Sequence, residues 1–584
     1  MKRTFRIITA LALVLALSYV TATAAQPEAP SRPSELPDTG MMPQDSGESL
    51  QVLVDEGIIS QETLEAILKF MEEYRPELPE DIDGSQPGNF PEKPDGMQGD
   101  APQMPGGQKP EGAPDTSDGG QNGSAPQMPD GQQPETPPEL PGNGSRLPML
   151  SQEMLDQLLE AEIITQEEYD AIAAFRQDAA DVTYTAATEI TAAASLENGI
   201  YLSDSADENA ILIDTDGEVT LVNPNVTKAG DSDGGDSCNF YGLNAAVLAK
   251  GGTTLTISGG TVTSDASGAN GVFSYGGNGG QNGAAGDGTT VNISDTVITT
   301  SGDGSGGIMT TGGGITNASN LTVTTSGRSS AAIRTDRGGG TVNVDGGTYT
   351  SNGLGSPAIY STAAITVQNA ALVSNLSEGV CIEGMNTVTL TNCDLTANNT
   401  QRNGNATFLD TVMIYQSMSG DADSGTSAFT MSGGSLTSKS GHVFHVTNTH
   451  AVITLNDVQI INEDSGNVLL SVCDDGWSGA ENNAELYASA QSISGTILMG
   501  SNSKLTLALS NGSAFTGSIS GEITDSKGTV ISSEVGAVSV TLDETSTWTL
   551  TADTYITSFE GNAAQIISNG FTLYVNGVAL SGTM

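Results

Sequence analysis

Positive charge is scarce in this 584-residue sequence. It contains 19 Lys and Arg against 70 Asp and Glu, so its formal net charge is −51. Nucleic acids and anionic membranes are bound through Lys and Arg, and this balance therefore argues against both as partners. Cations, neutral glycans or a basic protein suit such a surface.

Cysteine and several catalytic motifs are also missing or rare. The four cysteines are Cys238, Cys381, Cys393 and Cys473, and no pair has the C-x-x-C spacing of a zinc site. Four thiols allow three complete disulfide pairings, and the sequence does not choose among them. It contains neither a phosphate-binding loop nor a G-x-S-x-G serine with evident triad partners.

Only one apolar run stands out, and it lies at the N-terminus. Three basic residues among the first six precede apolar residues 7–20, and small residues follow at 21–25. This order predicts a secretory signal peptide over residues 1–25, with an uncleaved anchor as the alternative. No later stretch is long enough to span a membrane. The sequence thus predicts a secreted or cell-surface protein.

Residues 26–47 and 76–148 are predicted to be linkers. They are rich in Pro, Gly, Gln and acidic residues, and the segment 101–111 recurs closely as 125–135. Such segments cannot bury enough apolar area to offset the loss of chain entropy, so we expect them to be disordered.

Two similar islands, residues 48–75 and 149–178, are each predicted to form a short helical hairpin. Ser60 and Thr165 are placed to cap the second helices, and Glu168 completes a capping box. The pattern resembles the small "leucine, glycine, isoleucine-threonine, glutamate" hairpins found beside many bacterial domains. Each island is too small to be stable alone, so we expect them to pair, dimerise or dock on a partner. Marginal spacer helices are the alternative.

Residues 182–500 repeat with a period that is typical of a solenoid. The apolar residues Val344, Val367 and Leu390 lie 23 residues apart, each at the centre of a short alternating strand. Two strands with a two-residue corner and a third strand complete each unit, which predicts an all-β fold, a right-handed parallel β-helix. Longer gaps indicate surface insertions. Residues 501–584 are predicted to be the β-helix end and a C-terminal β cap.

Four stretches of the repeat region resemble a family of secreted β-helix proteins of gut bacteria. They are residues 306–314, 330–340, 355–362 and 415–423. Members of this family are usually labelled adhesin-like or carbohydrate-binding-domain proteins. The resemblance implies a pectate-lyase-like fold and a surface location, but it supplies no catalytic residues.

The third strand of successive coils gathers side chains that could bind a ligand. If the Val and Ile residues of these strands point inward, the alternating neighbours form outward columns. Most of a solenoid surface should be Ser, Thr and Asn, but these columns and their flanks contain Tyr275, Arg334, Asp336, Arg337, Tyr360, Glu383 and Tyr415. Aromatic rings beside carboxylates and Arg are typical of sugar binding.

Asp336 and Glu383 could also be catalytic. They lie two coils apart in one column, which corresponds to about 9.6 Å at a strand spacing of about 4.8 Å. That separation is near the upper end for inverting glycosidases. The alternative is that both are solvated charges, with Asp336 paired to Arg334 or Arg337.

Two weaker metal-site hypotheses concern an acidic loop and the histidines. Asp231, Asp233 and Asp236 lie in a glycine-rich loop that could bind Ca²⁺, although it does not fit an EF-hand. A second such loop begins at Asp421. His442 and His445 are expected to point to opposite sides of a strand, which argues against joint metal ligation.

Three functions remain open at this point: glycan or host-surface binding, polysaccharide cleavage on the same fold, and a structural spacer. A β-helix alone does not decide among them. The enzyme hypothesis predicts a groove walled by the loops around Asp231 and Asp421. The binding hypothesis predicts an open, flat face.

Overall fold

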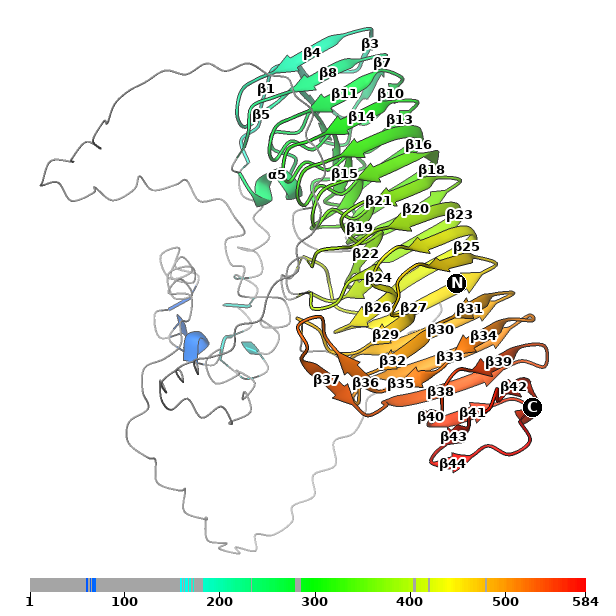
Figure 1. Ribbon diagram of the computed structural model, residues 1–584. Helices are drawn as coiled ribbons and strands as arrows, with labels where there is room; N and C mark the ends of the chain where they lie inside the picture. Colours follow the sequence, from blue (N-terminus) through cyan, green and yellow to red (C-terminus); the bar gives the residue numbers. More distant parts are fainter. Residues whose placement is uncertain are drawn as a thin grey trace, which may run out of the picture. The chain divides into compact units, whose positions relative to one another are not determined.

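The structure is a computed structural model of the chain (Figure 1). It describes residues 182–232, 234–278, 285–402, 406–417, 421–477 and 481–583, with scattered positions between 59 and 172. The predicted signal peptide and both predicted linkers lie outside the described residues. Among the described residues, no helix is long and apolar enough to cross a membrane.

The repeat region is a parallel β-helix, as the sequence predicts. Val344 in β18 (Gly340–Ser351) is in register with Val367 in β20 (Ala364–Gln368). Val367 pairs in turn with Leu390 of β23 (Thr387–Ala397), and Leu390 pairs with Met431 of β25 (Thr426–Ser438). The 41-residue gap before Met431 is therefore one coil that carries an insertion, as predicted. Figure 1 shows the strands as successive parallel arrows.

The third strands of the coils form one sheet, called the third sheet below, which carries the candidate site. Within the described residues this sheet has 13 strands. Those used below are β9 (Val247–Lys250), β12 (Val272–Tyr275), β15 (Ile308–Thr311), β17 (Ile333–Thr335), β19 (Ile359–Ser361), β22 (Val380–Glu383), β24 (Asp410–Tyr415), β26 (His442–Thr447) and β29 (Val468–Val472). The first strands of the coils and most of the second strands form another sheet, of 20 strands, whereas the second strands of the last coils form a separate sheet of four.

Alternating side chains fill the interior of the solenoid. Val344 and Val367 are buried within one continuous apolar core that runs through the coils. The corners between the first two strands use residues with positive φ, for example Asn369 at 57°. The Asn369 side-chain amide donates to Asp345 Oδ1 of the preceding coil at 2.8 Å. The corners are thus linked from coil to coil, as the core is.

The C-terminal end departs from the parallel arrangement. β43 (Leu573–Val575) pairs in parallel with β40 (Thr554–Ile556), but its other neighbour, β44 (Val578–Ala579), is antiparallel. The rings of Tyr555 and Tyr574 stack with centroids 4.6 Å apart. This antiparallel hairpin covers the last parallel strand, as the predicted cap requires.

The described parts of the two helical islands contact one another. The Ser60 hydroxyl accepts the Thr63 N–H at 3.0 Å, and the Thr165 hydroxyl and Glu168 carboxylate form the predicted capping box. The Thr63 hydroxyl donates to Glu168 Oε1 at 3.0 Å across the two islands. Leu64 and Leu158 are buried. Of the three associations that we expected, the structure contains the pairing of the two islands.

Candidate functional site

The predicted outward columns of the third sheet are confirmed by its register. Phe273 pairs with Met309, Met309 with Arg334, and Arg334 with Tyr360, which is followed by Cys381. The neighbouring inward positions hold a buried ladder of small hydroxyl residues, Ser274, Thr310, Thr335 and Ser361. Residues from coils far apart in sequence therefore share one outer surface.

That outer surface is covered rather than open, which corrects the expectation of a flat exposed face. The loop that contains helix α5 (Asp236–Phe240) lies over the first coils, and the Thr311 hydroxyl donates to its Phe240 carbonyl at 2.6 Å. Phe273 and Met309 have no exposed surface. A local alternation pattern cannot reveal this cover, because the loop contacts strands up to 95 residues later.

Arg337 joins this loop to a second one. Its Nη2 lies 2.6 Å from Asp421 Oδ1, and its guanidinium carbon lies 4.2 Å from the centre of the Phe240 ring. The loops around Asp231 and Asp421, which the enzyme hypothesis expected as walls, thus both reach this part of the sheet. Arg337 is therefore engaged in a loop contact and is not a freely exposed ligand-binding side chain.

Arg334 and Asp336 form an ion pair at the end of β17, with Nη2 and Oδ2 2.9 Å apart. Nη1 of Arg334 also donates to Asn239 Oδ1 in α5 and to the Ser329 carbonyl, both at 3.0 Å. Asp336 Oδ1 accepts the Arg337 N–H at 3.0 Å. The pairing expected as an alternative for Asp336 is present, but the carboxylate is buried instead of solvated.

Glu383 is held by hydroxyl groups at the end of β22. Its Oε2 accepts hydrogen bonds from Tyr360 and, at 3.0 Å, from Tyr415, while its Oε1 accepts from Ser417. Only 2% of Glu383 is exposed. The register predicts the approach of Tyr415, because it pairs with Glu383 in the next coil. Sequence reasoning missed Ser417, which follows the strand in the insertion.

Burial shifts the acid–base properties of both carboxyl groups. It raises the pKa of Asp336 to about 7, against the opposing effect of Arg334. Burial also raises the pKa of Glu383, although the hydroxyl donors of Ser417 and Tyr360 lower it. Asp421 adds to the rise at both sites. The charged forms are disfavoured because water is replaced by protein.

A tryptophan that sequence reasoning missed completes the group. The Trp477 ring lies 4.9 Å from the Tyr415 ring, and it packs against the small cluster of Cys381, Met413 and Tyr415, as Tyr360 does. Trp477 is half-buried, and so is Tyr360. It comes from the loop after β29, four coils beyond β19, so only the folded chain brings these rings together. We call the following set the acid–aromatic cluster: Arg334, Asp336, Tyr360, Glu383, Tyr415, Ser417 and Trp477.

Tyr275 belongs to a different part of the surface. Its ring contacts that of Tyr241 at 5.7 Å in an edge-on arrangement, and it packs with Phe273 and Met309 under the α5 loop. Burial raises the pKa of Tyr275 to about 12. The structure therefore brings together six of the seven predicted third-strand residues around β17 to β24 and places Tyr275 among the apolar contacts of the first coils.

The acidic loop is not assembled around a metal position among the described residues. Asp231 accepts the Ser267 N–H at 2.8 Å, Asp236 lies in α5, and Asp233 is outside the described residues. The nearby Gly230 carbonyl accepts a hydrogen bond from Nζ of buried Lys228 at 2.8 Å. In the described part of the chain, no group of three His, Cys, Asp or Glu is placed to hold a metal ion.

The two strand histidines converge, so the expectation that they point apart is wrong. Nδ1 of His442 and Nδ1 of His445 each lie 2.7 Å from Ser471 Oγ, and His445 Nε2 lies 3.1 Å from Asp475. Burial lowers the pKa of His442 to about 3, so it is neutral. Phe408 contacts both imidazole rings, with centroids 5.2 Å apart. His445 and Ser471 have no exposed surface, which favours a structural role.

All four cysteines are buried and none forms a disulfide. Cys381 lies in the outward column between Tyr360 and Met413, whereas Cys393 is part of the interior core. Stacking of coils, rather than cross-linking, therefore holds this fold together.

No family model matches the sequence, and no curated protein or solved structure is significantly similar to it. The resemblance to adhesin-like β-helix proteins therefore stays a prediction.

Proposed function

We propose that the protein is a secreted or cell-surface β-helix protein that binds glycans through the acid–aromatic cluster. The observation that carries this proposal is that Tyr360 and Tyr415 both donate to a buried carboxylate, with Trp477 packed on Tyr415. An Arg–Asp pair lies on the strand next to Tyr360. Aromatic rings can pack on the apolar face of a sugar, and charged side chains form strong, directional hydrogen bonds with its hydroxyl groups.

Preorganisation supports binding at this place. Arg334 is fixed by Asp336 and by Asn239, so few of its rotamers must be restricted when a ligand arrives. The half-buried Tyr360, which pairs with Arg334 in the sheet, offers ring surface next to it, and the half-buried Trp477 adds ring surface beside Tyr415. The carboxyl groups of Asp336, Glu383 and Asp421 lie near one another here, so they favour a neutral glycan as ligand at this cluster.

A glycan panel tests the proposal. The full mature chain should bind one or more glycans, and Trp477→Ala should weaken that binding by about tenfold or more. Tyr487→Ala is the matched control, because Tyr487 is exposed on the sheet formed by the first strands. No binding by the wild-type chain, or equal loss in both variants, would contradict the proposal and favour a structural spacer.

A second candidate function is cleavage of a polysaccharide by Asp336 and Glu383. It is favoured by the loops around Asp231 and Asp421, which both reach this part of the sheet as this hypothesis expects. It is also favoured by the pKa of Asp336, which burial raises to about 7, since a general acid must hold its proton near neutral pH. Arg334 and the tyrosines would then position the sugar. Glu383→Gln should abolish release of reducing ends while leaving glycan binding measurable. No release by the wild-type chain on any glycan that it binds would exclude this candidate.

A further inference from the structure

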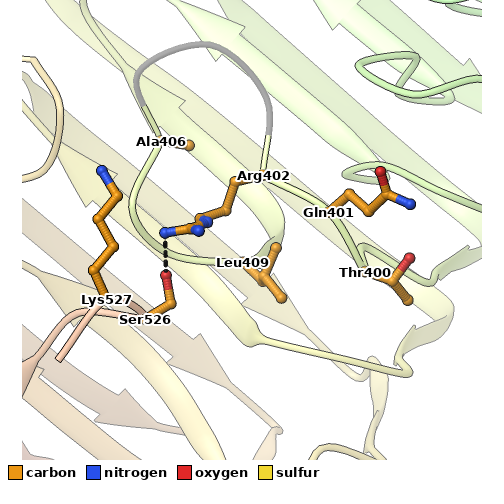
Figure 2. A pocket seen from close by; sticks show the side chains of 7 residues that line it. All are labelled: Thr400, Gln401, Arg402, Ala406, Leu409, Ser526 and Lys527. Atoms are coloured by element: carbon orange, nitrogen blue, oxygen red, sulfur yellow. Dashed lines mark hydrogen bonds between the residues drawn. The ribbon is translucent and has the colours of Figure 1, made fainter.

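A hollow of about 500 Å³ lies between two segments more than 100 residues apart (Figure 2). One segment is the insertion after β23, which contributes Thr400, Gln401 and Arg402. The other is the turn of the antiparallel hairpin formed by β36 (Glu522–Thr524) and β37 (Val530–Ser533), which contributes Ser526 and Lys527. In Figure 2 the Arg402 side chain reaches toward Ser526.

The charge of the hollow is opposite to that of the chain. Two of its seven lining residues are basic and none is acidic, although the whole sequence has 70 acidic against 19 basic residues. In the part of the chain that the structure describes, neither Arg402 nor Lys527 forms an ion pair with a carboxylate. Both side chains are exposed, so their charges are available to a ligand.

The walls of the hollow are fixed by specific contacts. Nη1 of Arg402 donates to Ser526 Oγ at 2.8 Å, and Ser526 donates to the Thr407 carbonyl. Asp525 Oδ1 accepts the N–H groups of Lys527 at 2.8 Å and Thr529 at 2.7 Å. The nearest acidic side chain in the turn is thus used to hold its backbone.

The base of the hollow is anchored to the core of the third sheet. Phe408 packs with Ile523 and Cys473, so the insertion and the hairpin share one small apolar cluster. Asp475 Oδ1 accepts hydrogen bonds from both the N–H and the hydroxyl of Thr407 at 2.6 Å. The buried His445 is paired with the same carboxylate. The buried contact between His445 and Asp475 therefore helps to hold Thr407, and with it the insertion that lines the hollow.

We propose that this hollow binds the anionic group, a carboxylate or sulfate, of an acidic saccharide. A guanidinium can bind two oxygens of such a group at once, and a lysine adds a compact positive charge. Thr400 and Gln401 supply hydroxyl and amide groups for the sugar ring. The volume lies within the range that accommodates small ligands. The inference that the ligand is a saccharide rests on the proposed function, whereas the inference that the hollow binds an anionic group does not.

The test uses calorimetric titration of the full mature chain with three probes: oligogalacturonate, a sulfated glycosaminoglycan oligosaccharide, and inorganic sulfate. We expect at least one acidic oligosaccharide to bind, with affinity that falls as salt is raised. Arg402→Gln and Lys527→Gln should each weaken it by about tenfold, since hydrogen bonds to charged groups are strong. Ser526→Ala, which preserves both charges but frees Arg402, should weaken it less.

Arg328→Gln is the matched control, because Arg328 is an exposed arginine in the turn after β16 (Gly314–Thr325). It should leave the affinity unchanged. Binding of inorganic sulfate alone would overturn the saccharide assignment. Equal affinity in the Arg402→Gln, Lys527→Gln double variant and the wild-type chain would overturn the whole inference.

Discussion

Asp336 shows how burial under a surface loop changes the pKa of a carboxyl group. Its ordinary pKa of 3.8 rises to about 7 because burial disfavours the charged form more than Arg334 favours it. Between pH 3.8 and about pH 7, the Asp336 carboxyl group is therefore protonated in the folded chain but ionised in the unfolded chain. Folding stability is lost as the pH rises through this window.

This sign gives a prediction for Asp336→Asn. The free energy of unfolding, measured in urea, should fall between about pH 4 and about pH 7 in the wild-type chain and fall less in the variant. Some dependence should remain, because burial also raises the pKa of Glu383 and Asp410. Asp394→Asn, at an exposed position, serves as the control. A wild-type stability that rises over this range would contradict the prediction.

At the scale of single elements, strands and insertions differ in how far the sequence predicts them. The strands repeat an alternation that is visible within a few residues, so the partners of Val367 and Leu390 follow from counting. The α5 loop has no such pattern, and its place is set by distant contacts such as that of Phe240 with Arg337. For the same reason, Trp477 and Ser417 could not be assigned to the site, whereas Tyr360 and Glu383 could.

The two covering loops should loosen together when Arg337 is replaced. In Arg337→Ala the ion pair with Asp421 and the contact with Phe240 are both lost. We expect faster amide hydrogen exchange in residues 236–245 and 421–425, with little change in the core strands. Arg328→Ala is the control at an exposed position. Unchanged exchange in both loops would show that Arg337 does not link them.

At the scale of the whole molecule, stability comes from like residues stacked in successive coils. Leu390 has no exposed surface and lies between Val367 and Met431. Leu390→Ala should lower the free energy of unfolding by about 2–5 kcal/mol, because it removes apolar contacts and leaves a cavity. Thr389→Ala, on the outer side of the same strand, should change it by about 0.5 kcal/mol or less. Similar effects in both variants would be inconsistent with the register.

The central claim is that a covered face of this β-helix, rather than its plain outer sheets, binds a glycan. Hydrogen exchange of the full chain, with and without a glycan identified in the panel, tests it most directly. We predict protection within residues 334–337, 360–362, 413–417 and 475–477, which hold the acid–aromatic cluster. Protection confined to the sheet of the first two strands, or to the helical islands, would contradict the account.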